Sequence, residues 1–205
     1  MFEKKLLTIV MLFLILGIGI SSDALAKVTL KLGTIAPKDS PWYDSLKKMG
    51  EEWRQVSGGL VELKIYPGGT IGNEVDMVRK MRQGRLQAAT ITAIGVREID
   101  ATYLALQVPQ LIRSEKEMDA CLEAIVPLAT ERLRNKGFEL IQVGDSGWIR
   151  FFTKEKIQTL DELRKLKLFV GAADPKSKEA WIRAGFKPVQ VNAADILPSL
   201  QTGLI

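Results

Sequence analysis

Between residues 28 and 92, segments with the two-residue period of a strand alternate with segments that have the 3.6-residue period of a helix. Strands separated by helices pair in parallel, because each crossover helix returns the chain to the same edge of the sheet. The sequence therefore predicts an α/β fold with a layered parallel sheet. The strands are expected at 28–33, 61–65 and 86–92, with one helix from Pro41 to a stop at Gly58 and another through Val75 to a stop at Gly84.

The same alternation continues in the second half of the chain, where a new series begins after Gly144. Residues 108–112 are expected to be a short strand or a loop. Because Gly203 and two apolar residues are what precedes a further strand in such a fold, the sequence is interpreted as a truncated piece of a longer protein. Helices are expected at 114–135 (kinked at Pro127), 160–166, 175–184 and 193–200, and strands at 138–143, 149–153, 168–170 and 188–191.

The first 26 residues have the layout of a secretory signal peptide. Lys4 and Lys5 precede an apolar stretch of 15 residues, and Ala24-Leu25-Ala26 is a cleavage signal. A membrane-spanning helix needs roughly 20 apolar residues, which favours a cleaved peptide over an anchor. The mature chain is expected to begin at Lys27 and to reside in the periplasm.

The composition excludes several chemistries. The chain contains no His and one Cys, so it has no Ser-His-Asp triad, no His-ligated metal and no intrachain disulfide. The net charge of +5 is modest and includes no run of five like charges, so no nucleic-acid partner is expected. We expect no cofactor and no enzymatic activity, although chemistry on carboxylates or lysines stays open.

Two segments are candidates for ligand binding. The loop Thr34–Trp42 follows the carboxyl end of a strand and precedes a helix, which is where open α/β sheets bind ligands. In the segment Gly147–Phe152, Arg150 is the one charge among apolar side chains. Such an Arg either binds a carboxylate or extends from the surface into water, and the sequence leaves both open. The glycine-rich segment Gly68–Gly72 lacks a phosphate-binding spacing and is interpreted as a plain turn.

The order of several stretches resembles the DctP-type extracytoplasmic solute-binding subunits of TRAP transporters. The resemblance implies a periplasmic binding protein-like fold, with two α/β domains and a ligand cleft between them. It also implies a small organic ligand and docking on the membrane subunits of the transporter. The expected divisions are 1–26 (signal peptide), 27–147 (domain I) and 148–205 (the incomplete start of domain II). The stretches that carry the resemblance are Lys31–Pro37, Ser57–Pro67, Gly72–Glu74, Met81–Ala88, Leu160–Leu168 and Ile196–Gly203.

One position departs from the family. Phe169 stands where the family usually has an Arg that holds a substrate carboxylate, and Arg150 roughly matches a second family Arg. We therefore hypothesise that the ligand is more apolar or aromatic than a simple organic acid. Alternatively, Phe169 packs in the core and residues beyond position 205 hold the ligand. With the resemblance taken into account, the expected ligand-binding residues are Trp42, Glu74, Thr92, Trp148, Arg150, Phe169 and Gly171.

Other functions compete with this one. The chain could be a periplasmic receptor of another class, such as an ABC-type receptor or a sensor. It could also be an exported enzyme on an α/β scaffold, or a truncated product without function.

Overall fold

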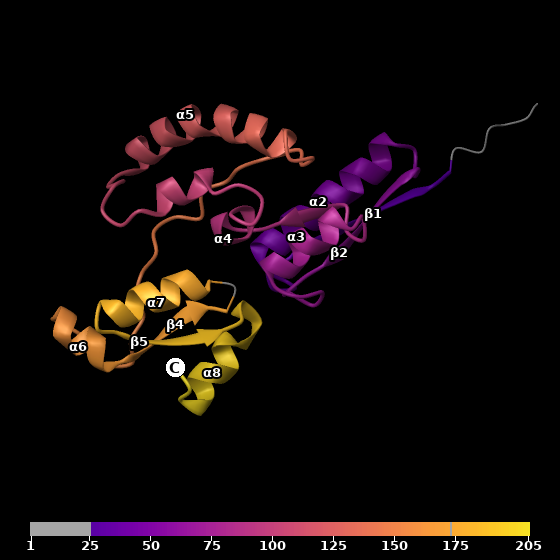
Figure 1. Ribbon diagram of the computed structural model, residues 1–205. Coiled ribbons are helices and arrows are strands. Elements are labelled where there is room, and N and C mark those ends of the chain that lie inside the picture. Colours follow the sequence, from indigo (N-terminus) through magenta and orange to yellow (C-terminus); the bar gives the residue numbers. More distant parts are fainter. Residues whose placement is uncertain (1–25, 173) are drawn as a thin grey trace, which may run out of the picture.

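The computed structural model describes residues 26–172 and 174–205 (Figure 1). The predicted signal peptide, apart from Ala26, lies outside the described residues. The described chain forms two lobes that are joined by residues 139–159. We call residues 28–134 the first lobe and residues 160–202 the second lobe. No helix in these two ranges or between them is long and apolar enough to cross a membrane.

The first lobe is built on a three-stranded parallel sheet, as the alternating pattern predicts. The strands are β1 (Val28–Thr34), β2 (Val61–Tyr66) and β3 (Ala88–Thr90), in the order β2-β1-β3. The predicted third strand is longer than the observed one. The sheet places the carboxyl ends of all three strands at one edge.

Two helices connect these strands, and the first begins at Pro41, where the sequence predicts. α2 (Pro41–Val56) starts after Ser40, whose side chain accepts a hydrogen bond from the Tyr43 backbone. α3 (Glu74–Arg82) begins with a capping box in which Asn73 and Asp76 each accept from the other's backbone N–H. These caps satisfy donors that the first helical turn leaves free.

The rest of the first lobe packs against α3. It comprises α4 (Ala93–Val96), the 3-10 helix η1 (Thr102–Gln107) and α5 (Glu115–Arg134). The predicted long helix is thus confirmed, and it continues through Pro127 as a bowed helix (Figure 1). The core between these helices contains Val78, Ile99, Tyr103, Ala129 and Leu133.

The second lobe has a two-stranded parallel sheet between helices. The chain runs through α6 (Leu160–Lys165), β4 (Lys167–Gly171), α7 (Pro175–Arg183), β5 (Lys187–Val191), η2 (Ala193–Asp195) and α8 (Ile196–Thr202). β4 and β5 pair directly, with Phe169 next to Val189. These elements agree with the predicted alternation, and α7 and α8 lie on opposite sides of the strands (Figure 1).

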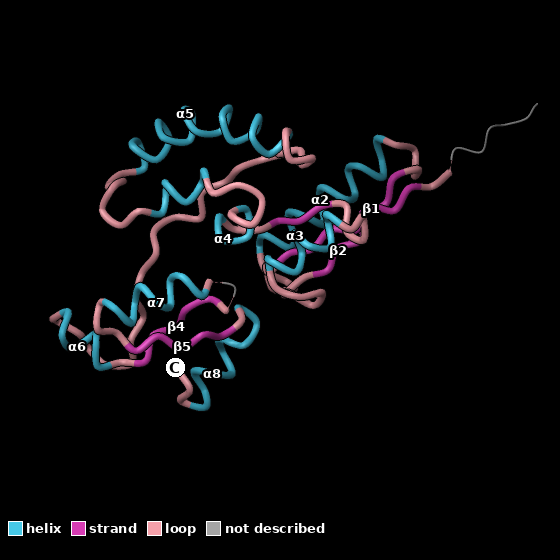
Figure 2. The backbone as a smooth tube through the Cα atoms, in the orientation of Figure 1, coloured by secondary structure: helices cyan, strands magenta, loops and turns pink. Residues whose placement is uncertain are grey.

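The predicted strands at 138–143 and 149–153 are wrong. Both ranges are irregular and fall in the connection between the lobes (Figure 2). A strand forms only where a neighbouring strand accepts and donates its backbone hydrogen bonds, and no described strand lies beside either range. An apolar, strand-like sequence alone was therefore not sufficient to predict a strand. Residues 108–112 form turns and loop, the second of the two predicted alternatives.

Candidate functional site

The carboxyl edge of the first sheet is formed by the end of β1, the loop after it and the turn after β2. Thr34 is buried, and its hydroxyl accepts a hydrogen bond from the Ala36 N–H. In the turn after β2, Gly68 N donates to the Ala36 oxygen and Gly69 N to the Thr34 oxygen. These amides are used inside the protein and do not form a phosphate cradle, which agrees with the interpretation of this segment as a plain turn.

Two of the predicted ligand-binding residues, Glu74 and Thr92, meet at this edge. Glu74 is the first residue of α3 and is 6% exposed, and its Oε1 accepts a hydrogen bond from the Thr92 backbone N–H. The Thr92 hydroxyl in turn accepts from Ile94 N at 3.2 Å and caps α4. A buried carboxylate thus orients the start of α4, while the Thr92 side chain remains exposed.

A close approach of backbone to side chain fixes this arrangement. A Cβ atom at Gly95 would lie 2.8 Å from the Glu74 Cβ and 2.9 Å from the Ile91 Cβ. Real Cβ atoms do not approach so closely, so only glycine lets α4 pack directly on Glu74. The position of the Glu74 carboxylate therefore depends on the absence of a side chain at residue 95.

An ion pair joins the first lobe to the second. Arg97, at the end of α4, donates from Nη1 to Oδ1 of Asp174 at 2.8 Å, and the two side chains are only 14% and 9% exposed. Asp174 follows β4, and its N–H donates to the Gly171 oxygen at 3.0 Å. The predicted residue Gly171 is thus at the junction, and the carboxyl edge of the second sheet lies beside α4.

The chemistry of Asp174 is set by this contact. Burial alone would raise the pKa of its carboxyl group, but hydrogen bonds from Arg97 and Ser177 outweigh burial and hold the pKa below its usual range. The carboxylate also caps α7 by accepting from Ser177 N at 3.3 Å. Asp174 therefore links the helix cap of the second lobe to a charge from the first lobe.

Replacing Asp174 with asparagine should loosen the junction while keeping the cap, because asparagine caps helices as well as aspartate does. We expect a loss of about 1.5–3 kcal/mol in the free energy of unfolding, the range of hydrogen bonds to charged groups. We also expect a larger radius of gyration in X-ray scattering. The control is Asp161→Asn, which removes an exposed pair with Arg164 and should cost less than about 0.5 kcal/mol. Equal effects of the two variants would contradict a joining role for Asp174.

The other predicted ligand-binding residues are exposed and are not brought into contact with one another. Trp42, Trp148 and Phe169 are 62%, 47% and 43% exposed, and Arg150 is also exposed. Arg150 has no ion pair with the described residues. The alternative that Phe169 packs in the core does not hold for the described chain.

One neighbour of Arg150 is held in place by the second lobe. The Phe151 ring meets Trp181 of α7 edge to face at 6.0 Å between ring centroids, and Trp181 meets Phe186 in the same way at 4.8 Å. These contacts hold the connecting segment against α7 and leave the Arg150 side chain accessible. Both alternatives for Arg150, carboxylate binding and exposure to water, remain compatible with this geometry.

Arg97 and Asp174 were not among the predicted site residues. Asp174-Pro175 with Ser177 is a local signal for a helix start, but no local pattern indicates a partner 77 positions away. Within residues 26–172 and 174–205, no group of three or more His, Cys, Asp or Glu side chains could hold a metal ion. At the edge of the first sheet, the Thr92 side chain is exposed, whereas the Glu74 carboxylate and the amides of Gly68 and Gly69 have partners within the protein.

Comparison with known proteins agrees with this geometry. The DctP family model, described as bacterial extracellular solute-binding protein, family 7, matches residues 32–205. A solute-binding protein of Roseobacter denitrificans is 26% identical over 191 residues, which are 90% of this chain and 57% of that protein. The 2,3-diketo-L-gulonate-binding periplasmic protein YiaO of Escherichia coli is 23% identical over 188 residues, which are 90% of this chain and 57% of that protein. The chain thus spans somewhat more than half the length of these curated relatives.

Solved structures show the same fold. A TRAP periplasmic solute-binding protein of Haemophilus influenzae with bound L-gulonate superimposes with a TM-score of 0.73 at 20% identity, over 87% of this chain and 59% of that one. A corresponding protein of Xanthobacter autotrophicus with bound β-D-galacturonate gives a TM-score of 0.76 at 21% identity, over 86% and 59% of the two chains. These proteins have two α/β domains, so the predicted fold class is confirmed.

Proposed function

The chain belongs to family 7 of the bacterial extracellular solute-binding proteins, the DctP family, and from this membership we propose that it is the solute-binding subunit of a TRAP-type transporter. It captures a small organic acid outside the cytoplasmic membrane and delivers it to the membrane subunits. The relatives are substrate-binding proteins rather than enzymes, and we infer that this chain also performs no bond chemistry. Residues 1–26 act as the signal peptide that sends it to the periplasm.

The observation that carries this proposal is the junction at the carboxyl edges of the two sheets. Glu74 and Thr92 lie at the edge of the first sheet, and the Arg97–Asp174 pair brings the end of β4 beside them. Ligands of open α/β sheets bind outside the carboxyl ends of the strands. We propose that residues 27–147 and 148–205 contribute to two domains whose cleft opens at this junction.

The proposed ligand class rests on the residues that the family resemblance assigns to the ligand site. With Phe169 in the place of the family Arg, Arg150 is the cation that we assign to the ligand carboxylate. Trp42, Trp148 and Phe169 contribute accessible aromatic surface. We propose that the ligand is an organic acid with a larger apolar or aromatic part than a simple dicarboxylate.

Calorimetric titration of the protein with aromatic acids, hexuronates and a C4-dicarboxylate tests this proposal. An aromatic acid should bind most tightly, and Arg150→Ala should weaken that binding about tenfold or more, since one charge-assisted contact is worth about 1.5–3 kcal/mol. Lys154→Ala, which removes a neighbouring exposed cation, is the control and should leave the affinity unchanged. Tight binding of the C4-dicarboxylate that is insensitive to Arg150→Ala would overturn the assignment.

A further inference from the structure

A cavity on the first lobe lies apart from the junction and has a strongly cationic lining. Its volume is about 280 Å³, and none of its lining residues is acidic. It opens between β1, the end of β2, the last turn of α3 and the loop before β3, whereas Glu74 and Thr92 are at the other end of α3 and beyond β3. The lining residues are Lys31, Tyr66, Ile71, Lys80, Arg85 and Leu86.

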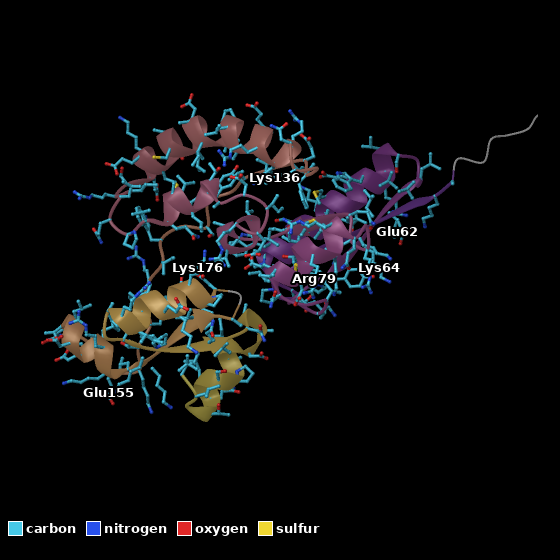
Figure 3. The ribbon with its side chains drawn as sticks, in the orientation of Figure 1. Glu62, Lys64, Arg79, Lys136, Glu155 and Lys176 are labelled. Atoms are coloured by element: carbon cyan, nitrogen blue, oxygen red, sulfur yellow. The ribbon has the colours of Figure 1, made fainter. Side chains whose placement is uncertain are left out.

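The sheet places a fourth cation beside this lining. Lys31 of β1 and Lys64 of β2 are register partners in the parallel pair, so their side chains emerge next to each other on one face. Like charges at neighbouring sheet positions repel each other and lower stability. The Lys64 ammonium lies 5.4 Å from the centroid of the Tyr66 ring, which directs it toward the cavity wall. Figure 3 labels Lys64 on the side of the first lobe that faces away from the second lobe.

No carboxylate of the described residues lies within ion-pair distance of these four cations. None of Lys31, Lys64, Lys80 and Arg85 takes part in an ion pair in the described chain. Glu62, the neighbouring acid on β2, is paired with Lys27 at 2.6 Å. Lys80 instead donates to the Ile71 carbonyl oxygen, which holds its ammonium at the rim of the cavity.

Local helix electrostatics explains only part of this arrangement. Cations in the last turn of a helix are favourable because they face its negative end, and Lys80 is in the last turn of α3. Lys31 and Lys64 are on the strands β1 and β2, so the dipole does not account for them. Lys31, Lys80 and Arg85 line one cavity together with Leu86 and Ile71, a combination that suits an anion with an organic group.

We propose that this cavity binds the phosphate group of an organic phosphate. Three cations that line one cavity, with Lys64 beside them, suit a phosphate better than a single carboxylate, because a phosphate offers more charge and more acceptor oxygens. The Tyr66 ring and Leu86 contact the organic part. A soluble phosphoester such as glycerol 3-phosphate and the headgroup of an anionic phospholipid share this chemistry, and the experiment separates the two sources.

The test measures binding of glycerol 3-phosphate by calorimetry and of phosphatidylglycerol vesicles by co-sedimentation, with phosphatidylcholine vesicles as the neutral reference. The double variant Lys31→Gln/Arg85→Gln should weaken binding about tenfold or more, and added salt should weaken binding to the unaltered protein. Binding of glycerol 3-phosphate identifies a soluble ligand. Binding of vesicles alone identifies a membrane surface, and either result supports the site.

Two further double variants keep the test specific. Lys31→Arg/Arg85→Lys preserves the charge and should retain binding. Lys47→Gln/Arg54→Gln removes two cations from the groove between α2 and β2, which Glu51 and Glu62 also line, and should have less than a twofold effect. Absence of binding to both probes, or equal losses in the two glutamine variants, would overturn the proposal. Titration of the same variants with organic acids reports separately on the proposed function.

Discussion

Replacing Asp100 with alanine is expected to lower the free energy of unfolding by about 3 kcal/mol, the largest effect that a single polar side chain of the first lobe should have. The Asp100 side chain is 2% exposed and accepts hydrogen bonds from Lys136 at 2.8 Å and from Arg132 at 3.0 Å. It also accepts from the Thr102 backbone N–H at 2.9 Å and from the Thr102 hydroxyl. The carboxylate thus ties the start of η1 to the end of α5, near the position of Lys136 in Figure 3.

The size of this effect follows from what the substitution leaves behind. The Thr102 N–H loses its acceptor, and two cations lose their counter-charge. Removing one partner of a fully buried ion pair costs about 3–5 kcal/mol. Arg132 and Lys136 are 54% and 47% exposed and can turn toward water, so the lower end of this range applies. For a chain of this length the melting temperature should fall by roughly 6–12 °C.

The control for Asp100→Ala is Glu139→Ala, at the same end of α5. Glu139 pairs with Arg134 at 2.6 Å, but both side chains are more than half exposed, so this change should cost less than about 0.5 kcal/mol. Urea denaturation of both variants measures the difference. Similar midpoints for the two variants would contradict a structural role for the buried carboxylate.

The contribution of Asp100 should also depend on pH. The hydrogen bond from Lys136 and those from Thr102, followed by that from Arg132, hold the pKa of Asp100 far below its usual range, against the opposing effect of burial. In the unfolded chain the Asp100 carboxylate should bind a proton at about pH 3.9, the usual value for Asp. The stabilisation of the folded state by Asp100 is therefore complete above that pH and is lost as the pH falls further. The stability difference between the natural chain and Asp100→Asn should therefore be constant above about pH 5 and shrink below about pH 4.

Replacing Phe169 with arginine is expected to raise the affinity for a hexuronate by about 10- to 100-fold. A hydrogen bond to a charged group contributes roughly 1.5–3 kcal/mol to the free energy of binding, which corresponds to this range of affinities. Phe169 is on β4 between the buried residues Leu168 and Val170, and its own side chain is 43% exposed. A longer cationic side chain can therefore be accommodated there, and its planar guanidinium can hold a carboxylate by two parallel hydrogen bonds.

Calorimetry with glucuronate measures the effect of Phe169→Arg. The matched control is Val56→Arg, which adds the same charge at the last residue of α2, where Val56 is 91% exposed. The control should change the affinity less than about twofold, because an exposed charge is screened by salt. If both variants improve binding equally, the gain is a general attraction and Phe169 does not set the ligand class. The affinity for an aromatic acid should fall in Phe169→Arg, because the ring is lost.

Local sequence signals were sufficient for most of the secondary structure. The caps at Ser40 and Asn73 act on residues at most three positions away, and the alternation in β1 and β2 reflects a side-chain period that each segment carries by itself. The order of strands and helices was enough to predict parallel pairing. Local sequence was misleading at 138–143 and 149–153, where the residues are largely apolar but no described strand lies beside them.

The sequence by itself therefore determined the alternating α/β architecture and the family, because both are encoded in short-range periodicity, caps and ordered motifs. Only the tertiary structure decided which charges meet. Glu74 accepts a hydrogen bond from the Thr92 N–H. Asp100 accepts hydrogen bonds from Lys136 and Arg132. Arg97 of the first lobe donates to Asp174, which lies next to the second lobe's α7. Such contacts depend on the path of the whole chain, since residues far apart in sequence become neighbours only after the sheets and helices have packed.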